Sequence, residues 1–167
     1  AEGAGDAAGG EQVLLDGNAA AAGAAFFSVH GAAHSPDHAL FAAAIDGNGS
    51  EYCRVRFTDP ATGAALPDEL ENAQGDMEWS ADGSVLFYTV LDDNHRPSRV
   101  FRHRMGTPAS DDVLVYEEAD PGFFLGVGKT ESGRFVVIDA HDHADTSEVR
   151  LIDAAAPEAG ARLVVAR

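Results

Sequence analysis

Three stretches of the sequence share one pattern and decide the fold: SPDHALFAAAID at residues 35–46, SADGSVLFYTVLDD at 80–93 and TESGRFVVIDAHD at 130–142. Each begins with a hydroxyl residue in a turn that contains Asp or Gly, continues as an apolar segment, and ends at a turn that carries Asp. The starting positions 35, 80 and 130 are 45 and 50 residues apart. Apolar runs of this length between turn residues are typical of strands, so the pattern predicts a repeat built from β-structure.

Further predicted strands flank each of these apolar segments. A strand that carries arginine follows each one, and Arg54, Arg102 and Arg150 are spaced by 48 residues in both intervals. Another apolar segment closes each unit, and a short one precedes each hydroxyl residue. The closing segments are Ala64–Leu66, Val113–Tyr116 and Leu163–Val165, and the preceding segments are Phe26–Val29, Met77–Trp79 and Phe123–Val127. Each unit therefore has four predicted strands.

Four strands in 45–50 residues is the format of a β-propeller blade. Neighbouring blades cover both faces of a blade, which explains why Val85–Tyr88 is apolar on both sides. Arg54 and Arg56 alternate with apolar residues, as in a half-exposed strand near the rim. We predict an all-β fold, a partial β-propeller of about three four-stranded antiparallel blades at about residues 13–75, 76–120 and 121–167.

Three blades do not close a ring, because known propellers use about four to eight. We therefore expect an incomplete ring and a chain that is a fragment of a longer protein. The middle blade has neighbours on both sides, so we expect it to be the best ordered, with one face of each outer blade uncovered.

The first residues differ from the rest in composition. Residues 1–12 hold Ala, Gly, Gln and acids and no large apolar side chain, which predicts a flexible leader. The Ala19–Ala25 run is consistent either with one helical turn capped by Asn18 or with an alanine-rich surface loop, because Gly23 interrupts it.

The overall composition excludes several classes of function. The 167 residues include 11 Lys and Arg against 28 Asp and Glu, a net charge of −17, which disfavours nucleic-acid binding. No stretch approaches the ~18 apolar residues of a membrane span. The single cysteine, Cys53, excludes an internal disulfide and a cysteine-based zinc site. We expect Cys53 to be a packing residue, since it lies on the apolar side of its strand with Val55 and Phe57.

Three short motifs suggest ligand sites but lack essential residues. Gly126–Thr130 is similar to the end of a nucleotide-binding P-loop, but the required first glycine is replaced by Phe123, and a strand rather than a helix follows. Asp46–Ser50 begins like a calcium loop but lacks the later glycine and glutamate, which favours a hairpin turn.

The histidines give the third motif. His141 and His143 could lie on one side of a strand, and His34 and His38 form a second pair, but neither pair has a third metal ligand at a known spacing. We therefore predict no metal site, although a metal or nucleotide site at these motifs stays open as a minor alternative.

One loop stands out as a candidate contact surface. The loop formed by Asp92, Asp93, Asn94, His95 and Arg96 is longer and more charged than its equivalents in the other blades. It is a candidate for contact with a partner or a second domain, and a solvated loop is the alternative. No Gly-x-Ser-x-Gly segment or complete catalytic triad pattern is present, so we predict no catalytic residue and no cofactor in this chain.

Several stretches resemble the propeller of oligopeptidase B-type enzymes in the prolyl oligopeptidase family of serine peptidases. They include VLLDGN at 13–18, LPDELEN at 66–72, LFYTVLDDNHRPSRVFRHRMGT at 86–107, DVLVYEE at 112–118 and TSEVRLIDA at 146–154. The resemblance runs from about Val13 to Arg167. It departs from the family at His38, where glycine is usual, and at Ala42–Ala44, where bulkier residues are expected.

The resemblance implies a two-domain serine oligopeptidase. Its C-terminal α/β-hydrolase domain, which would hold the catalytic Ser, Asp and His, is absent from this chain. The propeller would restrict access to short basic peptides, cleaved after Arg or Lys. The resemblance also implies a cytoplasmic location, with the periplasm as the alternative. A second hypothesis is a non-catalytic propeller that acts as a scaffold for protein partners.

Overall fold

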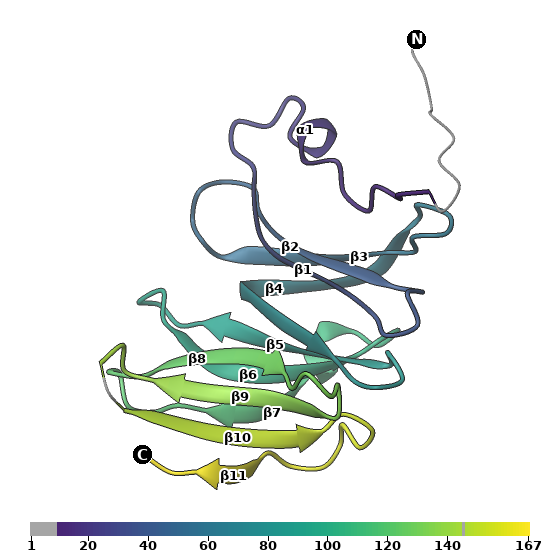
Figure 1. Ribbon diagram of the computed structural model, residues 1–167. Helices are drawn as coiled ribbons and strands as arrows, with labels where there is room; N and C mark the ends of the chain where they lie inside the picture. The colour runs from purple at the N-terminus through teal and green to yellow at the C-terminus, as the bar shows by residue number, and fades with distance from the viewer. Residues whose placement is uncertain (1–9, 145) are drawn as a thin grey trace.

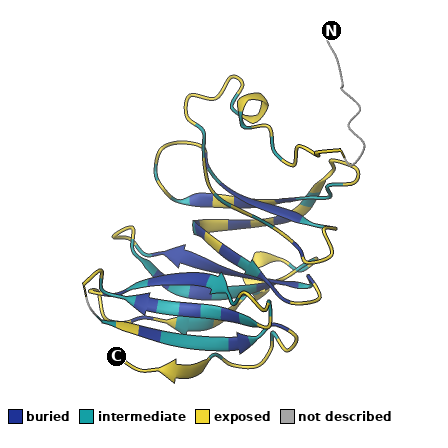
Figure 2. Ribbon diagram, viewed as in Figure 1, coloured by how far each residue is buried: buried dark blue, intermediate teal, exposed yellow. Residues whose placement is uncertain are grey.

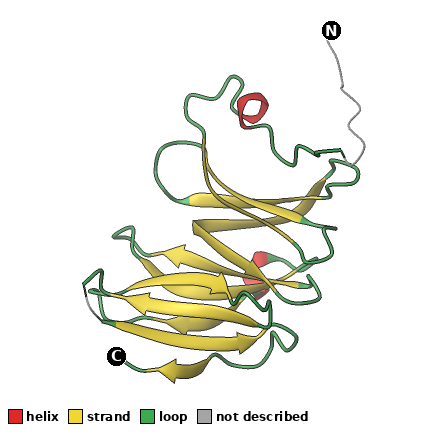
Figure 3. Cartoon of the chain, viewed as in Figure 1, coloured by secondary structure: helices red, strands yellow, loops and turns green. Residues whose placement is uncertain are grey.

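The computed structural model describes residues 10–144 and 146–167, and these residues form strands joined by turns (Figures 1 and 3). The strands are β1 (Ser28–His34), β2 (Phe41–Asp46), β3 (Cys53–Thr58), β4 (Ala65–Trp79), β5 (Val85–Leu91), β6 (Pro97–Arg104), β7 (Val113–Glu117), β8 (Phe124–Lys129), β9 (Phe135–His141), β10 (Ser147–Asp153) and β11 (Arg162–Val165). The two short helices are α1 (Gly17–Ala20) and the 3₁₀ helix η1 (Ala109–Asp111). No helix in the described ranges is long and apolar enough to cross a membrane.

The strands form two antiparallel sheets. One has seven strands in the order β1-β2-β3-β4-β5-β6-β7, and the other has four in the order β11-β10-β9-β8. Within each sheet, strands that are consecutive in the sequence pair with each other, and the sheets do not close into a ring (Figure 1). The prediction of an all-β fold with an open ring is confirmed. The exact blade boundaries stay a prediction.

Strand β4 differs from the prediction. The segments Ala64–Leu66 and Met77–Trp79 were expected to be separate strands, but they are the two ends of the 15-residue strand β4. The first half of β4 pairs with β3 up to Ala73, and the second half pairs with β5 from Ala73 onwards. Register shifts and a φ of 140° at Gly75 bend the strand between the halves. One strand therefore serves two successive four-stranded groups, so the described chain has eleven strands instead of twelve.

Strand β1 also lies later than predicted. The segment Phe26–Val29 was expected to be the strand, whereas β1 runs over Ser28–His34. Its small residues allow a close approach to β4: a Cβ added at Gly31 would lie 2.1 Å from the carbonyl oxygen of Gly75. The indole N–H of Trp79 donates to the carbonyl of Ala33 at 3.2 Å. Glycine is needed at residue 31 because the backbone of β4 occupies the space that a side chain would need.

The three turns that open the repeat share one hydrogen-bond pattern. The hydroxyl of Ser35 accepts the backbone N–H of Leu40, that of Ser80 accepts the N–H of Val85, and that of Thr130 accepts the N–H of Phe135, at 2.9, 3.0 and 3.1 Å. Each hydroxyl thus closes the hairpin five residues ahead of it. This explains why a hydroxyl residue recurs at the start of each unit.

The first of these turns contains a histidine where the others have glycine. His38 has φ 61°, and the equivalent Gly83 and Gly133 have φ 70° and 71°. Only glycine adopts this left-handed conformation without steric cost. The His38 ring stacks on His34 with centroids 4.4 Å apart. The departure from the family pattern at this position therefore leaves the turn geometry unchanged and introduces backbone strain.

The core consists of two apolar clusters that share β5. Leu86, Tyr88 and Val90 belong to the cluster formed with β2, β3 and β4, whereas Val85 and Phe87 belong to the cluster formed with β8, β9 and β10. Successive side chains of a strand point to opposite faces, so β5 is buried on both sides along its whole length (Figure 2). At the other extreme, every residue of β11 is exposed.

The N-terminal segment requires a correction. The sequence left two alternatives for Ala19–Ala25, a helical turn capped by Asn18 and a surface loop. The structure has a short helix, but α1 begins at Gly17 and its cap is Asp16, whose Oδ1 accepts the N–H groups of Asn18 and Ala19 at 3.0 Å. Asp16 precedes the helix, so its side chain can reach these free N–H groups. Of the predicted leader 1–12, residues 1–9 lie outside the described residues, and residues 10–12 are exposed and without regular structure.

Candidate functional site

The loop singled out from the sequence divides into a structural part and an exposed part. Asp92 Oδ1 accepts the backbone N–H groups of Asn94 and Arg96 at 2.9 and 3.1 Å, and Asp92 Oδ2 accepts the Arg96 Nε–H at 3.0 Å. The Arg96 side chain is only 13% exposed. These two of the five predicted residues therefore hold the loop in shape.

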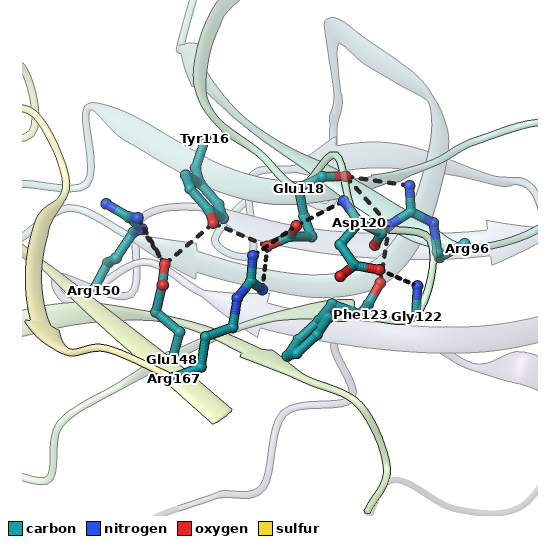
Figure 4. A network of polar contacts seen from close by, with 9 residues as sticks. All are labelled: Arg96, Tyr116, Glu118, Asp120, Gly122, Phe123, Glu148, Arg150 and Arg167. Atoms are coloured by element: carbon teal, nitrogen blue, oxygen red, sulfur yellow. Dashed lines mark hydrogen bonds and ion pairs between the residues drawn. The ribbon is translucent and has the colours of Figure 1, made fainter. Parts of the chain in front are cut away.

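Arg96 also connects the loop to the start of the second sheet. Its Nη1 donates to the backbone carbonyls of Glu118, Asp120 and Phe123 at 3.2, 2.8 and 2.9 Å (Figure 4). A guanidinium is suited to this position because it has five N–H donors in a planar arrangement. Arg96 thereby fixes the segment that leads from β7 into β8.

The remaining loop residues, Asp93, Asn94 and His95, are exposed. The His95 ring lies 4.7 Å from the Tyr52 ring, and its Nδ1 is 3.4 Å from Glu51 Oε2. His95 therefore connects the loop to the β2–β3 turn. These three residues are the ones whose side chains a partner could contact, and that role stays a prediction.

Beside Arg96 lies a second polar group, the Glu118 cluster, formed by Tyr116, Glu118, Glu148, Arg150 and Arg167 (Figure 4). The Glu118 side chain is 3% exposed. Its carboxylate accepts from Arg167 Nη1 at 2.8 Å, the Asp120 N–H at 2.8 Å and the Tyr116 hydroxyl at 3.0 Å. Arg167 also covers the Phe123 ring, 4.0 Å from its centroid. Burial opposes the charge of Glu118, but the hydrogen bonds from Arg167, Asp120 and Tyr116 outweigh it and lower the pKa of this carboxyl.

His95 also lines a hollow between the two sheets, with a volume of about 450 Å³. Its titratable lining residues are His30, Glu51, Asp76, His95, Asp139, His141 and His143. No lysine or arginine of the described ranges lines it. The hollow therefore combines carboxylates with histidines and lacks a permanent cation.

Two carboxylates of this hollow, Asp76 and Asp139, lie near each other. Asp76 is exposed to the hollow, but the protein atoms around it partly desolvate its carboxylate. This desolvation, together with the nearby charge of Asp139, raises the pKa of Asp76, although a hydrogen bond from the Val127 N–H opposes the shift. Asp139 Oδ2 lies 3.0 Å from His141 Nδ1. Gly126 makes room for this pair, because a Cβ there would lie 2.6 Å from Asp139 Oδ1. The arrangement favours the approach of a positively charged group.

His141 and His143 lie close to each other at the rim of the hollow. The rings of His141 and His143 are edge to face with centroids 4.8 Å apart, and the His143 ring is 4.3 Å from that of Phe124. Within residues 10–144 and 146–167, no three His, Cys, Asp or Glu side chains are grouped so that they could hold a metal ion.

Asp46 accepts four backbone N–H groups of its own turn, including that of Glu51 at 2.8 Å. Asp46–Ser50 is therefore a hairpin turn.

The P-loop-like segment is a strand and a turn. Gly126–Lys129 belongs to β8, and Thr130 closes the hairpin that leads into β9. Lys129 Nζ lies 3.0 Å from Glu78 Oε2. The lysine that would bind phosphate is thus paired with a carboxylate of β4, and no helix follows it.

Cys53 is buried, as the alternation of β3 predicts. It is 1% exposed, and burial, with a smaller effect of Asp46, raises the pKa of its thiol to about 11. A thiol with this pKa is almost entirely protonated at neutral pH, so its nucleophilic form is rare. That Cys53 is unreactive stays a prediction.

Sequence reasoning missed one buried group, the His103 cluster of Asp68, Tyr88, His103 and Asp112. The sequence placed His103 on a strand between Arg102 and Arg104 but gave no indication of its partners. Asp68 and Asp112 are 35 and 9 residues away. No short motif joins these positions, so only the pairing of the strands brings them together.

Comparison with known proteins identifies the fold. The sequence profile of a family described as prolyl oligopeptidase, N-terminal beta-propeller domain, matches residues 2–167. Dipeptidyl aminopeptidase BI of Pseudoxanthomonas mexicana is 44% identical over 158 residues, which is 94% of this chain and 22% of that protein. Protease 2 of Moraxella lacunata is 33% identical over 156 residues, 92% of this chain and 22% of that protein. This chain thus spans about a fifth of the length of these relatives.

Solved structures agree with the sequence comparison. Oligopeptidase B from Leishmania major is similar with a TM-score of 0.86 at 30% identity, covering 92% of this chain and 22% of that one. Oligopeptidase B from Trypanosoma brucei, in a closed form with covalently bound antipain, gives a TM-score of 0.82 at 30% identity and covers 97% of this chain and 23% of that one. The three groups of four strands are therefore blades of a partial β-propeller, as predicted.

Proposed function

This chain belongs to the prolyl oligopeptidase family, within its N-terminal β-propeller domain, and from that membership we propose that it is the substrate-filtering part of a serine oligopeptidase. In this proposal the catalytic Ser, Asp and His belong to a C-terminal α/β-hydrolase domain of the same parent chain. The propeller limits access to short peptides, and cleavage follows Arg or Lys. The parent enzyme acts in the cytoplasm, with the periplasm as the alternative.

The observation that carries the proposal is the match of nearly the whole chain to a propeller domain while the chain spans 22% of its relatives. A preference for basic peptides is supported by the net charge of −17 and by the hollow with Glu51, Asp76 and Asp139. Carboxylates around a concave surface raise the local concentration of cationic ligands, and the effect weakens with salt.

A second candidate activity is the release of dipeptides from a free N-terminus. The observation in its favour is the 44% identity to a protein named dipeptidyl aminopeptidase BI, which exceeds the 30% identity to oligopeptidase B. The oligopeptidase would bind a basic side chain, and the dipeptide-releasing enzyme would bind a free amine. Both groups are positively charged, so the acidic hollow is compatible with either activity.

The test uses the full-length parent protein and matched peptides. Peptides with Arg or Gln before the cleaved bond are offered with a free or an acetylated N-terminus. Cleavage of acetylated Arg peptides supports the oligopeptidase, whereas strict dependence on the free amine supports dipeptide release. The absence of serine-dependent hydrolysis of any peptide would overturn both and favour a scaffold.

A variant experiment tests the contribution of the hollow. In the parent protein, Asp76→Asn with Asp139→Asn is expected to lower kcat/KM for Arg peptides severalfold at low salt, with a smaller effect at high salt and on Gln peptides. Glu131→Gln is the matched control, because the exposed Glu131 lies in the turn at the opposite end of β8 and β9. Equal effects of both variants would remove the hollow from the proposal.

The exposed loop residues are assigned to the contact with the rest of the parent chain. The side chains of Arg96 and Asp92 make their hydrogen bonds within the propeller. Asp93, Asn94 and His95 are therefore the residues available for this contact. We expect residues 93–95 to be protected from hydrogen exchange or chemical labelling in the full-length protein but not in the 167-residue chain.

A further inference from the structure

His103 on β6 is enclosed between two carboxylates. Its side chain is 0% exposed, its Nδ1 lies 2.7 Å from Asp112 Oδ1, and its Nε2 lies 3.0 Å from Asp68 Oδ1. The side chains of Asp68 and Asp112 are 4% and 3% exposed. Both ring nitrogens thus face a carboxylate oxygen inside the protein.

The other elements around His103 supply hydrogen bonds but no second cation. The Tyr88 hydroxyl on β5 donates to Asp112 Oδ2 at 2.8 Å, and the backbone N–H of Gly106 donates to Asp68 Oδ1 at 2.6 Å. From β3, the Phe57 ring stacks on the imidazole with centroids 5.9 Å apart. The titratable groups that face His103 are therefore Asp68, Tyr88 and Asp112, and neither carboxylate pairs with a lysine or arginine of the described chain.

This geometry fixes the protonation of the ring. A neutral imidazole has one N–H donor, and an ionised carboxylate only accepts. Hydrogen bonds at both nitrogens therefore require the imidazolium, or a proton on one of the aspartates. The proton favours the imidazole, because an aspartic acid releases it at a pH more than two units lower. Burial opposes the charged ring, but the hydrogen bonds and charges of Asp112 and Asp68 outweigh burial and raise the pKa of His103 above 6.5.

The cluster connects two blades. Asp68 lies in the half of β4 that pairs with β3, whereas His103 lies on β6 and Asp112 immediately precedes β7. We propose that His103 is an imidazolium in the folded protein at neutral pH, that it holds the first blade to the second, and that loss of its proton at alkaline pH releases this contact. Without that proton, two buried carboxylates face a ring that can donate to only one of them.

The direction of the pH effect follows from proton linkage. Above about pH 6.5 an unfolded histidine releases its proton, whereas folded His103 retains it. Unfolding therefore releases a proton, and the opening equilibrium constant rises by up to tenfold per pH unit until the pH passes the raised pKa of His103. The stabilisation is complete below about pH 6.5 and is lost as the pH rises from there through the raised pKa of His103.

The first test observes the proton directly. In the full chain labelled with ¹⁵N-histidine, NMR at pH 7.5 is expected to show protons on both ring nitrogens of His103, assigned by their proximity to the ring protons of Phe57, which stacks on the imidazole. The control is His95, whose side chain is 47% exposed and which should show the averaged signal of a ring that exchanges freely with water. A His103 ring with one protonated and one bare nitrogen at pH 7.5 would overturn the proposal, and this result needs no folded variant.

The second test measures the consequence for the interface. Hydrogen exchange of residues 65–70 and 105–112, corrected for the intrinsic rate, is followed from pH 6 to pH 10. Protection in the wild-type chain should fall by up to tenfold per pH unit above pH 6.5, while His95→Gln behaves as wild type and His103→Gln shows low protection at every pH. Protection that is independent of pH in the wild-type chain would contradict the proposed release.

Discussion

The middle blade packs against a neighbour on each side, and both interfaces contain an apolar cluster. The buried charge at the centre of one interface is opposite in sign to that at the centre of the other. Between the first and second blades, the His103 cluster places a cation between two carboxylates. Between the second and third, the Glu118 cluster places a carboxylate among an arginine, a tyrosine hydroxyl and a backbone N–H. The sign of the central charge determines which side of neutral pH weakens each interface.

The two clusters also differ in exposure. His103 and both of its carboxylates are almost completely buried, whereas Arg167, the partner of Glu118, is 30% exposed. Solvent screens the second cluster and can replace a lost partner there. We therefore expect substitutions in the His103 cluster to have larger effects than those in the Glu118 cluster.

The largest effect is expected for His103→Leu. The variant leaves Asp68 and Asp112 facing each other without a cation, which should lower the free energy of unfolding by about 3–5 kcal/mol. Urea unfolding followed by the fluorescence of Trp79, the one tryptophan of the chain, measures the change. His95→Leu is the control, and adding Asp68→Asn and Asp112→Asn should recover part of the loss. A decrease below about 1 kcal/mol would mean that the buried charges are not coupled.

Glu118→Gln should have the next largest effect on the free energy of unfolding, and it should also change how stability falls at acid pH. Loss of the charged acceptor is expected to lower stability by about 2 kcal/mol at pH 7. The pKa of Glu118 is lowered in the folded state, so its contribution is complete above the unfolded value of 4.5 and is lost as the pH falls through the folded value. Thermal melting from pH 7 to pH 3 should show that Glu118→Gln loses less stability on acidification than wild type does. If the two proteins lost stability equally, the loss would have to be assigned to other carboxylates.

Arg96→Lys tests whether the second interface also depends on neutral acceptors. Lysine has a single nitrogen and cannot bond Asp92 and the three carbonyls through separate atoms, as Nε and Nη1 of Arg96 do, so we expect a decrease in the free energy of unfolding of about 1–2 kcal/mol. Hydrogen exchange should quicken at residues 118–123. Arg99→Lys is the matched control, because Arg99 makes one long contact, 3.4 Å, with the Leu91 carbonyl. Equal exchange rates in the two variants would contradict the anchoring role of Arg96.

The smallest effect is expected for Tyr88→Phe. It removes the hydroxyl that donates to Asp112 and keeps the ring, which should cost about 1 kcal/mol. The alkaline loss of stability should persist because His103 and both carboxylates remain. If the alkaline loss disappeared in this variant, it would have to be assigned to Tyr88 rather than to His103, and chemical unfolding at pH 7 and pH 9.5 distinguishes the two.

The sequence alone was sufficient for features whose hydrogen bonds close within about five residues. The hydroxyls of Ser35, Ser80 and Thr130 and the apolar run of β5 predicted the hairpins and the doubly buried strand, because turn chemistry and the two-residue period of a strand are local. The family resemblance likewise followed from local motifs. The propeller class was correct for this reason, and the open ring followed from the count of three blades.

Tertiary structure alone decided the features that depend on which backbones lie side by side. Strand β4 is continuous because it pairs with β3 along its first half and with β5 along its second half. Strand β1 extends beyond the predicted apolar segment because its backbone contacts β4 where Gly31 meets Gly75. Arg96 turns inward because three carbonyls of the segment between β7 and β8 lie within its reach. His103 gained its carboxylates only when strands from two blades came together, and a buried charge is determined by such neighbours in space, which sequence spacing does not specify.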